Sequence, residues 1–311
     1  MFFTGWHLDA NRYRVYACLY ALVRCTAMIG APAVSYGALS ASGEFVASVQ
    51  SPSVAEASGV IASRRNRGIV WMHNDGRTGY VYGVGPGGDV AATIALQQPV
   101  ADFEDIAIGP GPQSGVDYLY VADIGDNNLL RQCVQTYRFR EPKIETIESD
   151  APTTIVRDAE RFELCYPGAK LDAEALLVDP QSGDLLVVAK ERRRARVYVA
   201  SSSQLVDGAR IDLRLAVNLK IGEVTGGDVA PDRSAVVLRS DDKGWIWRCQ
   251  ASQKIEEAFS SQMPREIPVR HPSQKGDGEA IGFHPTSDAY FTISEGRKPS
   301  LCLFPVPSPA E

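Results

Sequence analysis

Apolar residues along this chain gather in short runs, and turn-forming residues separate one run from the next. Runs such as "GIVWMHND" and "GDLLVVAKE" are rich in Val, Ile, Leu and aromatic residues, and Gly, Pro, Asp and Ser stand between such runs. Runs of about four to eight residues bounded in this way are typical of β-strands. The pattern therefore predicts a mostly β protein of many short strands joined by tight turns.

A short phrase recurs along the chain, in which an acidic residue precedes an apolar run that ends at proline. The clearest copies read "FEDIAIGP", "DAEALLVDP" and "DGEAIGFHP". Alignment gives five copies, centred on Glu56, Glu104, Glu174, Gly227 and Glu279. Their spacings are 48, 70, 53 and 52 residues. A period of about 50 residues indicates either propeller blades or solenoid units.

The segments that follow each copy favour the propeller. Every copy leads through a turn into a second apolar run, such as "DYLYVADIGDN", and then into a third, such as "GWIWRCQ". A fourth, more polar segment ends four of the five units. Four antiparallel strands in each unit make a propeller blade.

The two ends of the repeat region complete one another. The fifth unit stops after its third strand, at Pro305, whereas the segment Gly43–Gln50 precedes the first unit without a partner. We expect this N-terminal strand to complete the last blade and so remove open sheet edges. The prediction is a single all-β propeller over residues 42–311, with five four-stranded blades. Six blades remain the alternative, because the second unit is 70 residues long.

Residues 1–41 differ from the rest of the chain. Arg12 and Arg14 precede an apolar stretch, Val15–Ala33, that ends among small residues, and this order matches an export signal. Arg24 interrupts the stretch, so a translation start placed too early and a membrane-anchoring helix are alternatives. The stretch is short for a membrane span, which needs about 20 uninterrupted apolar residues. We expect export to the periplasm or the cell exterior, with no stable membrane span in the mature form.

Charge argues against one class of partner. The 311 residues carry a formal net charge of -6 at pH 7, and an acidic protein is poorly suited to bind nucleic acid. The one strongly basic run, "KERRRARVY", is interpreted as a solvated turn between two strands. No nucleic-acid partner is expected.

Four cysteines lie outside the leader, and they show no spacing typical of a zinc site. Cys133 and Cys165 fall in consecutive predicted strands. They could form a disulfide in an oxidising compartment, and buried free thiols are the alternative.

The propeller prediction brings the recurring acids together. The first strand of a blade lines the central channel and the second returns antiparallel beside it, so the start of the first and the end of the second share one rim. The residues at the starts are Glu56, Glu104, Asp105, Glu174, Asp228 and Glu279. Those at the ends include His73, Asp75, Lys190, Arg239 and Glu295.

Carboxylates gathered within about 10 Å raise one another's pKa unless water, a basic side chain or a metal ion compensates them. Ca²⁺ accepts about six to eight oxygen ligands in flexible geometry. The predicted ligands are Glu56, Glu104, Asp105, Glu174, Asp228 and Glu279. Zinc fits less well because His73 is the only imidazole nearby. A ring that is solvated, or paired with Lys190 and Arg239, is the alternative.

The phrases "DAEALLVDPQSGDLLVVAKE", "EDIAIGPGPQSGVDYLYVADIGDN" and "GEAIGFHPTSDAYFTISEG" resemble those of exported bacterial β-propellers described as phytase-like or esterase-like. The resemblance covers about Val54 to Leu303. It implies Ca²⁺ in the channel and, in the enzymes of the group, attack on a phosphate ester by metal-bound water. On this chain it implies that the four aligned glutamates and Asp228 face the metal, and that Lys190 and Arg239 hold substrate oxygens.

The chain departs from that family pattern in three ways. Gly227 stands where the other four copies have Glu. Five units are visible where the phytase-like fold has six blades. Few Lys and Arg residues flank the acids, which argues against a polyphosphate substrate.

Two functions fit these observations. The first is an exported propeller whose calcium-binding channel mouth binds a small molecule, a glycan or a protein partner. The alternative is a calcium-dependent phosphoester or ester hydrolase that uses metal-bound water, with His73 as a candidate general base. The candidate catalytic residues are Glu174, Glu104, Lys190, Arg239 and His73.

Overall fold

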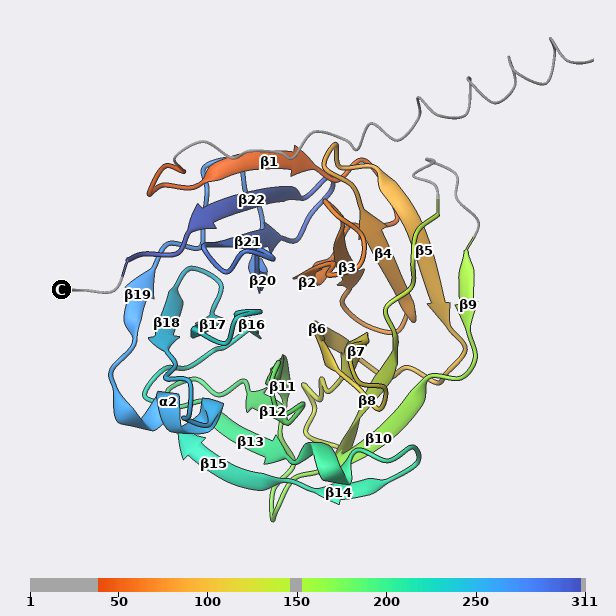
Figure 1. The fold of residues 1–311 in the computed structure, drawn as a ribbon, viewed down its shortest axis with the longest axis vertical. Helices are drawn as coiled ribbons and strands as arrows, with labels where there is room; N and C mark the ends of the chain where they lie inside the picture. The colour runs from red at the N-terminus through yellow and green to blue at the C-terminus, as the bar shows by residue number, and fades with distance from the viewer. Residues whose placement is uncertain (1–38, 146–152, 309–311) are drawn as a thin grey trace, which may run out of the picture. The chain divides into compact units, whose positions relative to one another are not determined.

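Five small β-sheets form a ring around a central channel in the computed structural model, which describes residues 39–145 and 153–308 (Figure 1). Helix in this part is confined to η1 (Ser202–Gln204) and α2 (Ile255–Ser261). The predicted all-β propeller with five blades is confirmed. The predicted leader, residues 1–41, lies almost wholly outside the described residues.

Each blade runs outward from an innermost strand. Blade 1 holds β2 (Ala57–Ala62), β3 (Val70–Asn74), β4 (Tyr80–Val84), β5 (Val90–Leu96) and β9 (Thr154–Val156). Blade 2 holds β6 (Phe103–Pro110), β7 (Asp117–Asp123), β8 (Cys133–Arg140), β10 (Glu160–Cys165) and β14 (Arg210–Asp212). Blade 3 holds β11 (Ala173–Val178), β12 (Leu185–Ala189), β13 (Arg196–Ala200) and β15 (Arg214–Asn218). Blade 4 holds β16 (Gly226–Val229), β17 (Ala235–Arg239), β18 (Gly244–Arg248) and β19 (Arg265–Ile267). Blade 5 holds β20 (Gly278–Phe283), β21 (Ala289–Ser294), β22 (Ser300–Pro305) and β1 (Glu44–Ser48).

The ring closes as predicted from the incomplete fifth unit and the unpartnered segment Gly43–Gln50. Strand β1 pairs antiparallel with β22, with Phe45 opposite Cys302 and Ser48 opposite Ser300. The first strand in the chain therefore supplies the outermost strand of the last blade (Figure 1). This pairing covers the edge that β22 would otherwise expose.

The long second unit does not hide a sixth blade. After β8 the chain crosses to blade 1, where β9 pairs parallel with β5, and then returns to blade 2 as β10. In the same manner β14, which follows the third strand of blade 3, pairs parallel with β10 at the outer edge of blade 2. The additional residues form strands shared between neighbouring blades.

The innermost strands are buried on both faces because each blade packs between two others. Every residue of β2 and β11 is buried, as is every residue of β12. This explains why these segments read as continuous apolar runs rather than as alternating ones. Gly282 marks a close approach between blades, since a Cβ there would overlap the carbonyl of Val60 in the next blade.

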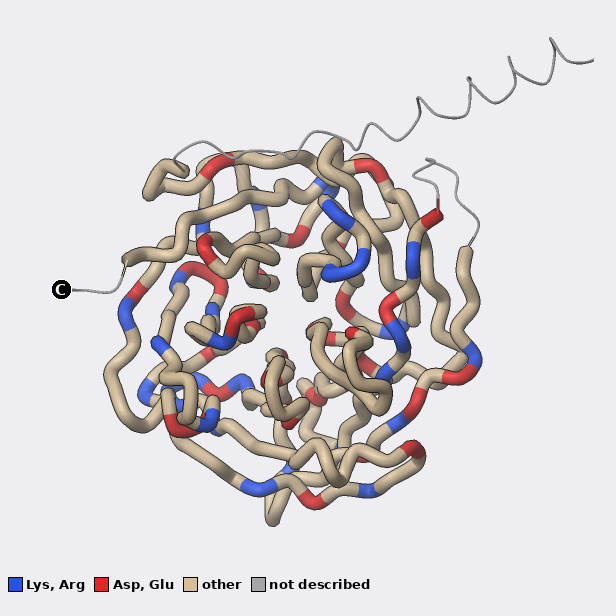
Figure 2. The backbone as a smooth tube through the Cα atoms, viewed as in Figure 1, with Lys and Arg blue, Asp and Glu red and all other residues tan. Residues whose placement is uncertain are grey.

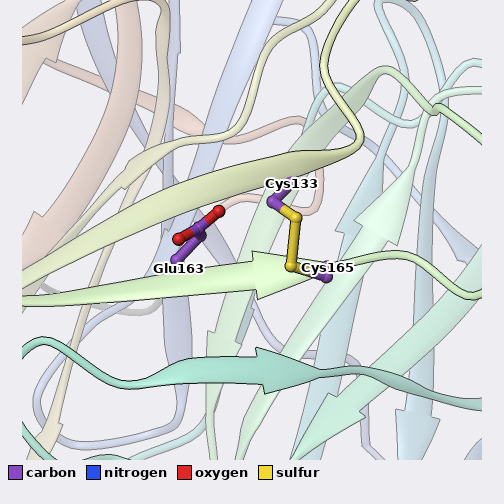
Figure 3. Close-up of side chains that lie close together, drawn as sticks. All are labelled: Cys133, Glu163 and Cys165. Atoms are coloured by element: carbon purple, nitrogen blue, oxygen red, sulfur yellow. A yellow bond between two sulfur atoms is a disulfide. The ribbon is translucent and has the colours of Figure 1, made fainter.

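Cys133 and Cys165 form a disulfide (Figure 3). They lie directly opposite one another on β8 and β10. The cross-link therefore ties two outer strands of blade 2, across a sequence separation of 32 residues. A bridge that closes a loop of this length contributes about 3.7 kcal/mol to the free energy of unfolding in the chain-entropy model. Cys249 and Cys302 are free thiols.

Removal of β1 should open the ring. We expect a variant that begins at residue 49 to unfold with a free energy lower by about 2–4 kcal/mol, because the hydrogen bonds between β1 and β22 are lost. The exposed edge of β22 should also promote self-association. Thermal unfolding and light scattering measure both effects. A control that begins at residue 39 retains β1, and equal stability of the two variants would contradict the proposed role of the strand.

Candidate functional site

A register shift near the start of four inner strands decides which side chains reach one rim of the channel. The shift lies between Ala57 and Gly59, Phe103 and Asp105, Ala173 and Ala175, and Gly278 and Ala280. The additional residues at these shifts are Ser58, Glu104, Glu174 and Glu279. A bulge of this kind leaves one residue out of the ladder and changes the direction of its side chain.

The shifts revise the alignment of two repeats. In blade 1 the additional residue is Ser58, and Glu56 lies two positions earlier, where its side chain is exposed. In blade 4 the pairing of Gly226 with Arg239 and of Gly227 with Leu238 continues without a shift. Blade 4 therefore has no residue equivalent to Glu104. Blade 1 has a serine at this position and blade 4 has no additional residue there, so only three blades present a glutamate.

Five carboxylates from three neighbouring blades form a cluster at this rim. Oxygens of Asp75, Asp102 and Glu104 lie within 4.8 Å of one another, and so do oxygens of Glu104, Asp172 and Glu174. We call these five residues the acidic cluster. Glu104 belongs to both groups and therefore sits at its centre. Figure 2 shows acidic positions at the inner ends of several blades around the middle of the ring.

Glu104 is the most constrained member of the acidic cluster. Its side chain is 5% exposed, and its carboxylate forms no hydrogen bond or ion pair with any described residue. Burial, followed by repulsion from Glu174 and Asp75, raises the pKa of Glu104 to about 11. Gly125 lies against it so closely that a Cβ would overlap Glu104 Oε1. The backbone of the "DIGDN" loop thus forms one wall of the cluster.

Among the described residues, Glu174 is the one member of the cluster that forms an ion pair with a basic side chain. Lys190 Nζ lies 2.5 Å from Glu174 Oε1. Burial raises the pKa of Glu174 to about 7, although Lys190 opposes this shift. Burial alone lowers the pKa of Lys190, but Glu174 and other nearby acids raise it above its ordinary value. Lys190 is therefore charged at neutral pH, and a third of its side chain is exposed.

Further acids surround the cluster. Burial and repulsion from Glu174 raise the pKa of Glu279 to about 8. Burial and repulsion from Asp75 also raise the pKa of Glu295 above its ordinary value. Glu56 contributes to the shifts of Asp75 and Glu295. Glu56, Glu279 and Glu295 therefore lie near enough to the acidic cluster to interact electrostatically with its members.

Asp105 and Asp228 lie outside the cluster and join blades to one another. Asp105 accepts hydrogen bonds from the backbone N–H groups of Ile106 and of Leu176 in blade 3, at 2.8 and 2.9 Å. Asp228 accepts from Val229 and from Phe283 in blade 5, both at 2.7 Å. Burial raises the pKa of Asp228 to about 7 and that of Asp105 well above its ordinary value. Their oxygens are committed to the backbone between blades.

His73 and Arg239 are also fully buried. His73 Nδ1 lies 2.8 Å from the carbonyl oxygen of Asn74, and burial lowers the pKa of His73 to about 4, so the ring is neutral at pH 7. The Arg239 guanidinium donates to the carbonyls of Ala280 and Asp241, at 3.0 and 2.7 Å. Arg239 thus holds the junction between blades 4 and 5, and neither side chain faces solvent at the mouth.

Sequence reasoning identified Glu104 and Glu174 but did not single out Asp102 and Asp172. Both aspartates stand two residues before the glutamate, in the repeated pattern Asp-x-Glu. Asp277 precedes Glu279 in the same way. This repeated pattern was the signal in the sequence that could have identified the aspartates. The glutamate is the additional residue of each bulge, and the bulge brings its carboxylate toward the same rim as that of the aspartate.

Comparisons with known proteins find matches among solved structures and none by family model or curated sequence. No family model and no curated protein matches the sequence. The structure is similar to a chain in the "Crystal Structure of Mitotic Checkpoint Complex", with 12% sequence identity and a TM-score of 0.37. The match covers 78% of this chain and 62% of that chain. Within the described residues, no helix has the length and apolar character needed to cross a membrane.

Proposed function

We propose that the acidic cluster binds a divalent cation, with Ca²⁺ as the best fit, and that the cation-loaded mouth binds a small molecule, a glycan or a protein partner. The observation that carries this proposal is the buried Glu104 carboxylate, which has four acidic neighbours and no basic partner among the described residues. An isolated buried carboxylate must either take up a proton or meet a cation.

The balance of charge supports a cation. The cluster contains five carboxyl groups, and Lys190 is the one basic residue that forms an ion pair with a member of it in the described ranges. Full ionisation would therefore leave a large uncompensated negative charge in a partly buried space. A divalent ion offsets two of these charges at once and removes the need for a proton on Glu104.

The chemistry of the donors favours Ca²⁺. Every potential ligand in the cluster is a carboxylate oxygen, and hard cations such as Ca²⁺ prefer oxygen. Softer metals would call for imidazole or thiolate ligands. Glu104 would be the shared ligand, with Asp75 and Asp102 on one side and Asp172 and Glu174 on the other. The resemblance to phytase-like propellers points to the same ion.

The surface beside the cluster suits a binding partner. Leu129 and Leu130 are 51% and 72% exposed, on the loop that also contains Gly125. Asp126 accepts hydrogen bonds from the backbone N–H groups of Leu130 and Arg131, so this loop is held in place. Two exposed leucines beside a charged mouth offer both apolar and ionic contacts to a ligand.

The disulfide supports export. Disulfides persist in secreted and periplasmic proteins and are rare in the reducing cytosol. The bond between Cys133 and Cys165 is therefore consistent with a protein that leaves the cytosol, as the order of residues 1–41 predicts.

Calcium-dependent hydrolysis is the second candidate. The specific observation in its favour is Glu174, whose pKa of about 7 in the metal-free protein suits a general base at neutral pH, and in this alternative Glu174 serves as the base rather than as a cation ligand. Its partner Lys190 is partly exposed and could hold an anionic substrate oxygen. A bound Ca²⁺ would supply electrostatic activation of water and substrate. His73 and Arg239 have no part in this proposal because both are buried and engaged with the backbone.

Without metal, stability should fall as the pH rises. The folded-state pKa values of Glu174 and Glu279 lie near 7 and 8, above the ordinary value of 4.5, and that of Asp228 near 7. The folded protein therefore holds protons that the unfolded chain releases, and the free energy of unfolding decreases between about pH 4 and pH 8. In chelator at pH 8, Glu104→Gln should raise it by about 2 kcal/mol. Denaturant unfolding across this pH range tests both statements, and a destabilised Glu104→Gln variant would contradict the second.

In calcium, the native protein should become more stable than the Glu104→Gln variant, the reverse of their order in chelator. We expect CaCl₂ to raise the unfolding midpoint of the native protein, because a ligand selective for the folded state stabilises it, by about 2.7 kcal/mol at one hundred times its Kd. Glu104→Gln should bind at least tenfold more weakly by calorimetry. Glu266→Gln, a change at an exposed residue of β19, should bind normally. Identical unfolding curves in calcium and in chelator would exclude the site.

A hydrolase would show calcium-dependent turnover. Phosphate, carboxylate and lactone esters can be screened with CaCl₂ and with chelator. Glu174→Gln should then reduce kcat by about 100-fold or more, through loss of the base, while Glu266→Gln should have no effect. Calcium binding without turnover would leave the binding function alone, and turnover unaffected by Glu104→Gln and Glu174→Gln would place the chemistry elsewhere.

A further inference from the structure

A hollow lies at the rim opposite the acidic cluster. Inner strands β2 and β6 end there, at Ala62 and Pro110, and β8 ends there at Arg140. The hollow has a volume of about 310 Å³ and lies between the loops of blades 1 and 2. The residues that matter to its chemistry are Arg64, Arg65, Asp117, Arg140 and Glu141. Figure 2 shows the loop between β2 and β3 as a basic run near the channel.

The three arginines of this hollow differ in their partners. Arg64 pairs with Asp117 at 2.8 Å and donates to the carbonyl of Ile108 at 3.2 Å. Arg65 donates to the carbonyl of Glu141 at 3.2 Å and forms no ion pair within the described ranges. Arg140 is exposed, and its guanidinium forms neither a hydrogen bond nor an ion pair with any residue described. Two guanidinium groups therefore lack a carboxylate partner.

Glu141 does not supply the missing partner. Its side chain is 1% exposed. One oxygen accepts from Trp71 Nε1 at 2.8 Å and from the Ser63 hydroxyl, and the other accepts from the backbone N–H of Arg65 at 3.0 Å. Both oxygens are thus used inside the wall of the hollow. Arg64 Nε is also buried, and it has no hydrogen-bond acceptor among the described residues. Hydrogen-bond acceptors for these arginines are therefore few.

We propose that this hollow binds the phosphate group of a small molecule, with Arg65 and Arg140 as the principal donors. Arginine presents a planar fork that bonds two oxygens of one phosphate. The lining holds three arginines and two carboxylates, a net charge of +1, and its two unpaired guanidinium groups face a phosphate monoester that carries about -1.5 to -2 at pH 7. A carboxylate carries one negative charge and would leave one guanidinium unpaired. The volume of the hollow lies in the range typical of small-molecule sites.

Calorimetric titration in chelator tests this site without any contribution from the acidic cluster. Inorganic phosphate and glycerol 3-phosphate are the two probes, and sodium acetate at equal ionic strength is the comparison. We expect one phosphate per chain and no acetate binding. Arg140→Gln should weaken binding at least tenfold, because a charge-assisted pair of hydrogen bonds is lost. The affinity of Arg140→Lys for phosphate should lie between those of the native protein and Arg140→Gln, since lysine keeps the charge but lacks the planar fork of the guanidinium.

Arg67→Gln is the matched control. Arg67 is an exposed residue on the same loop as Arg64 and Arg65, but it does not line the hollow. This variant should bind phosphate within twofold of the native protein. The unfolding midpoint without phosphate should be the same for all variants, because neither Arg67 nor Arg140 has a partner in the described structure.

Three results would overturn the proposal. They are binding of neither phosphate probe at millimolar concentration, equal losses in Arg67→Gln and Arg140→Gln, and acetate binding as tight as that of phosphate. The second would indicate attraction to the basic rim as a whole, and the third a carboxylate site. Tighter binding of glycerol 3-phosphate than of inorganic phosphate would identify an organic phosphate as the ligand, and equal binding would identify the free ion.

Discussion

The additional residue at the start of an inner strand controls the chemistry of the channel mouth. Inner strands are packed between blades, so their regular ladder positions are filled by apolar side chains or by groups bonded to a neighbouring backbone. A residue outside the ladder escapes this requirement and can present a carboxylate. Glu104, Glu174 and Glu279 reach the mouth in this way. Blade 4 has an uninterrupted ladder and contributes no such group.

Two kinds of buried carboxylate coexist a few residues apart, and their partners distinguish them. Asp105 and Asp228 each receive backbone N–H groups from their own strand and from the adjacent blade. These bonds satisfy their oxygens and join the blades. Glu104 has the same burial and no such donors in the described structure. A buried acid without donors is costly to a fold unless something else supplies the positive charge, and this contrast separates a structural role from a ligand-binding one.

Much of the fold could be predicted from the sequence, because the repeat and the orphan strand each had one simple explanation. Residues 43–50 and the incomplete fifth unit required ring closure. The length of the second unit was ambiguous, since a strand that crosses to the neighbouring blade, as β9 does, has no signature in the local pattern.

The candidate site was less accessible to the same reasoning. A bulge has no distinctive residue type, so the alignment followed the acidic residue and placed Glu56 at the position that the structure gives to Ser58, two residues later. The polarity of Arg239 correctly indicated the end of a strand. Its long side chain could extend toward the mouth or fold back among backbone carbonyls, and in the structure it folds back and donates to two of them. The Asp-x-Glu pattern could have indicated Asp102 and Asp172, but which acids from neighbouring blades lie together is seen only in the structure.

The junctions between neighbouring blades differ, because some blades share a strand with their neighbour and others do not. Strand β1 links the last blade to the start of the chain, β9 links blades 1 and 2, and β14 links blades 2 and 3. Blades 3 and 4 share no strand and are connected by the buried pair of Asp179 and Arg233, while blades 4 and 5 rely on Asp228, Thr225 and Arg239. The segments between β15 and β16 and between β19 and β20 therefore connect blades that share no strand, so new chain termini at either place would leave every shared strand joined to its neighbouring blade.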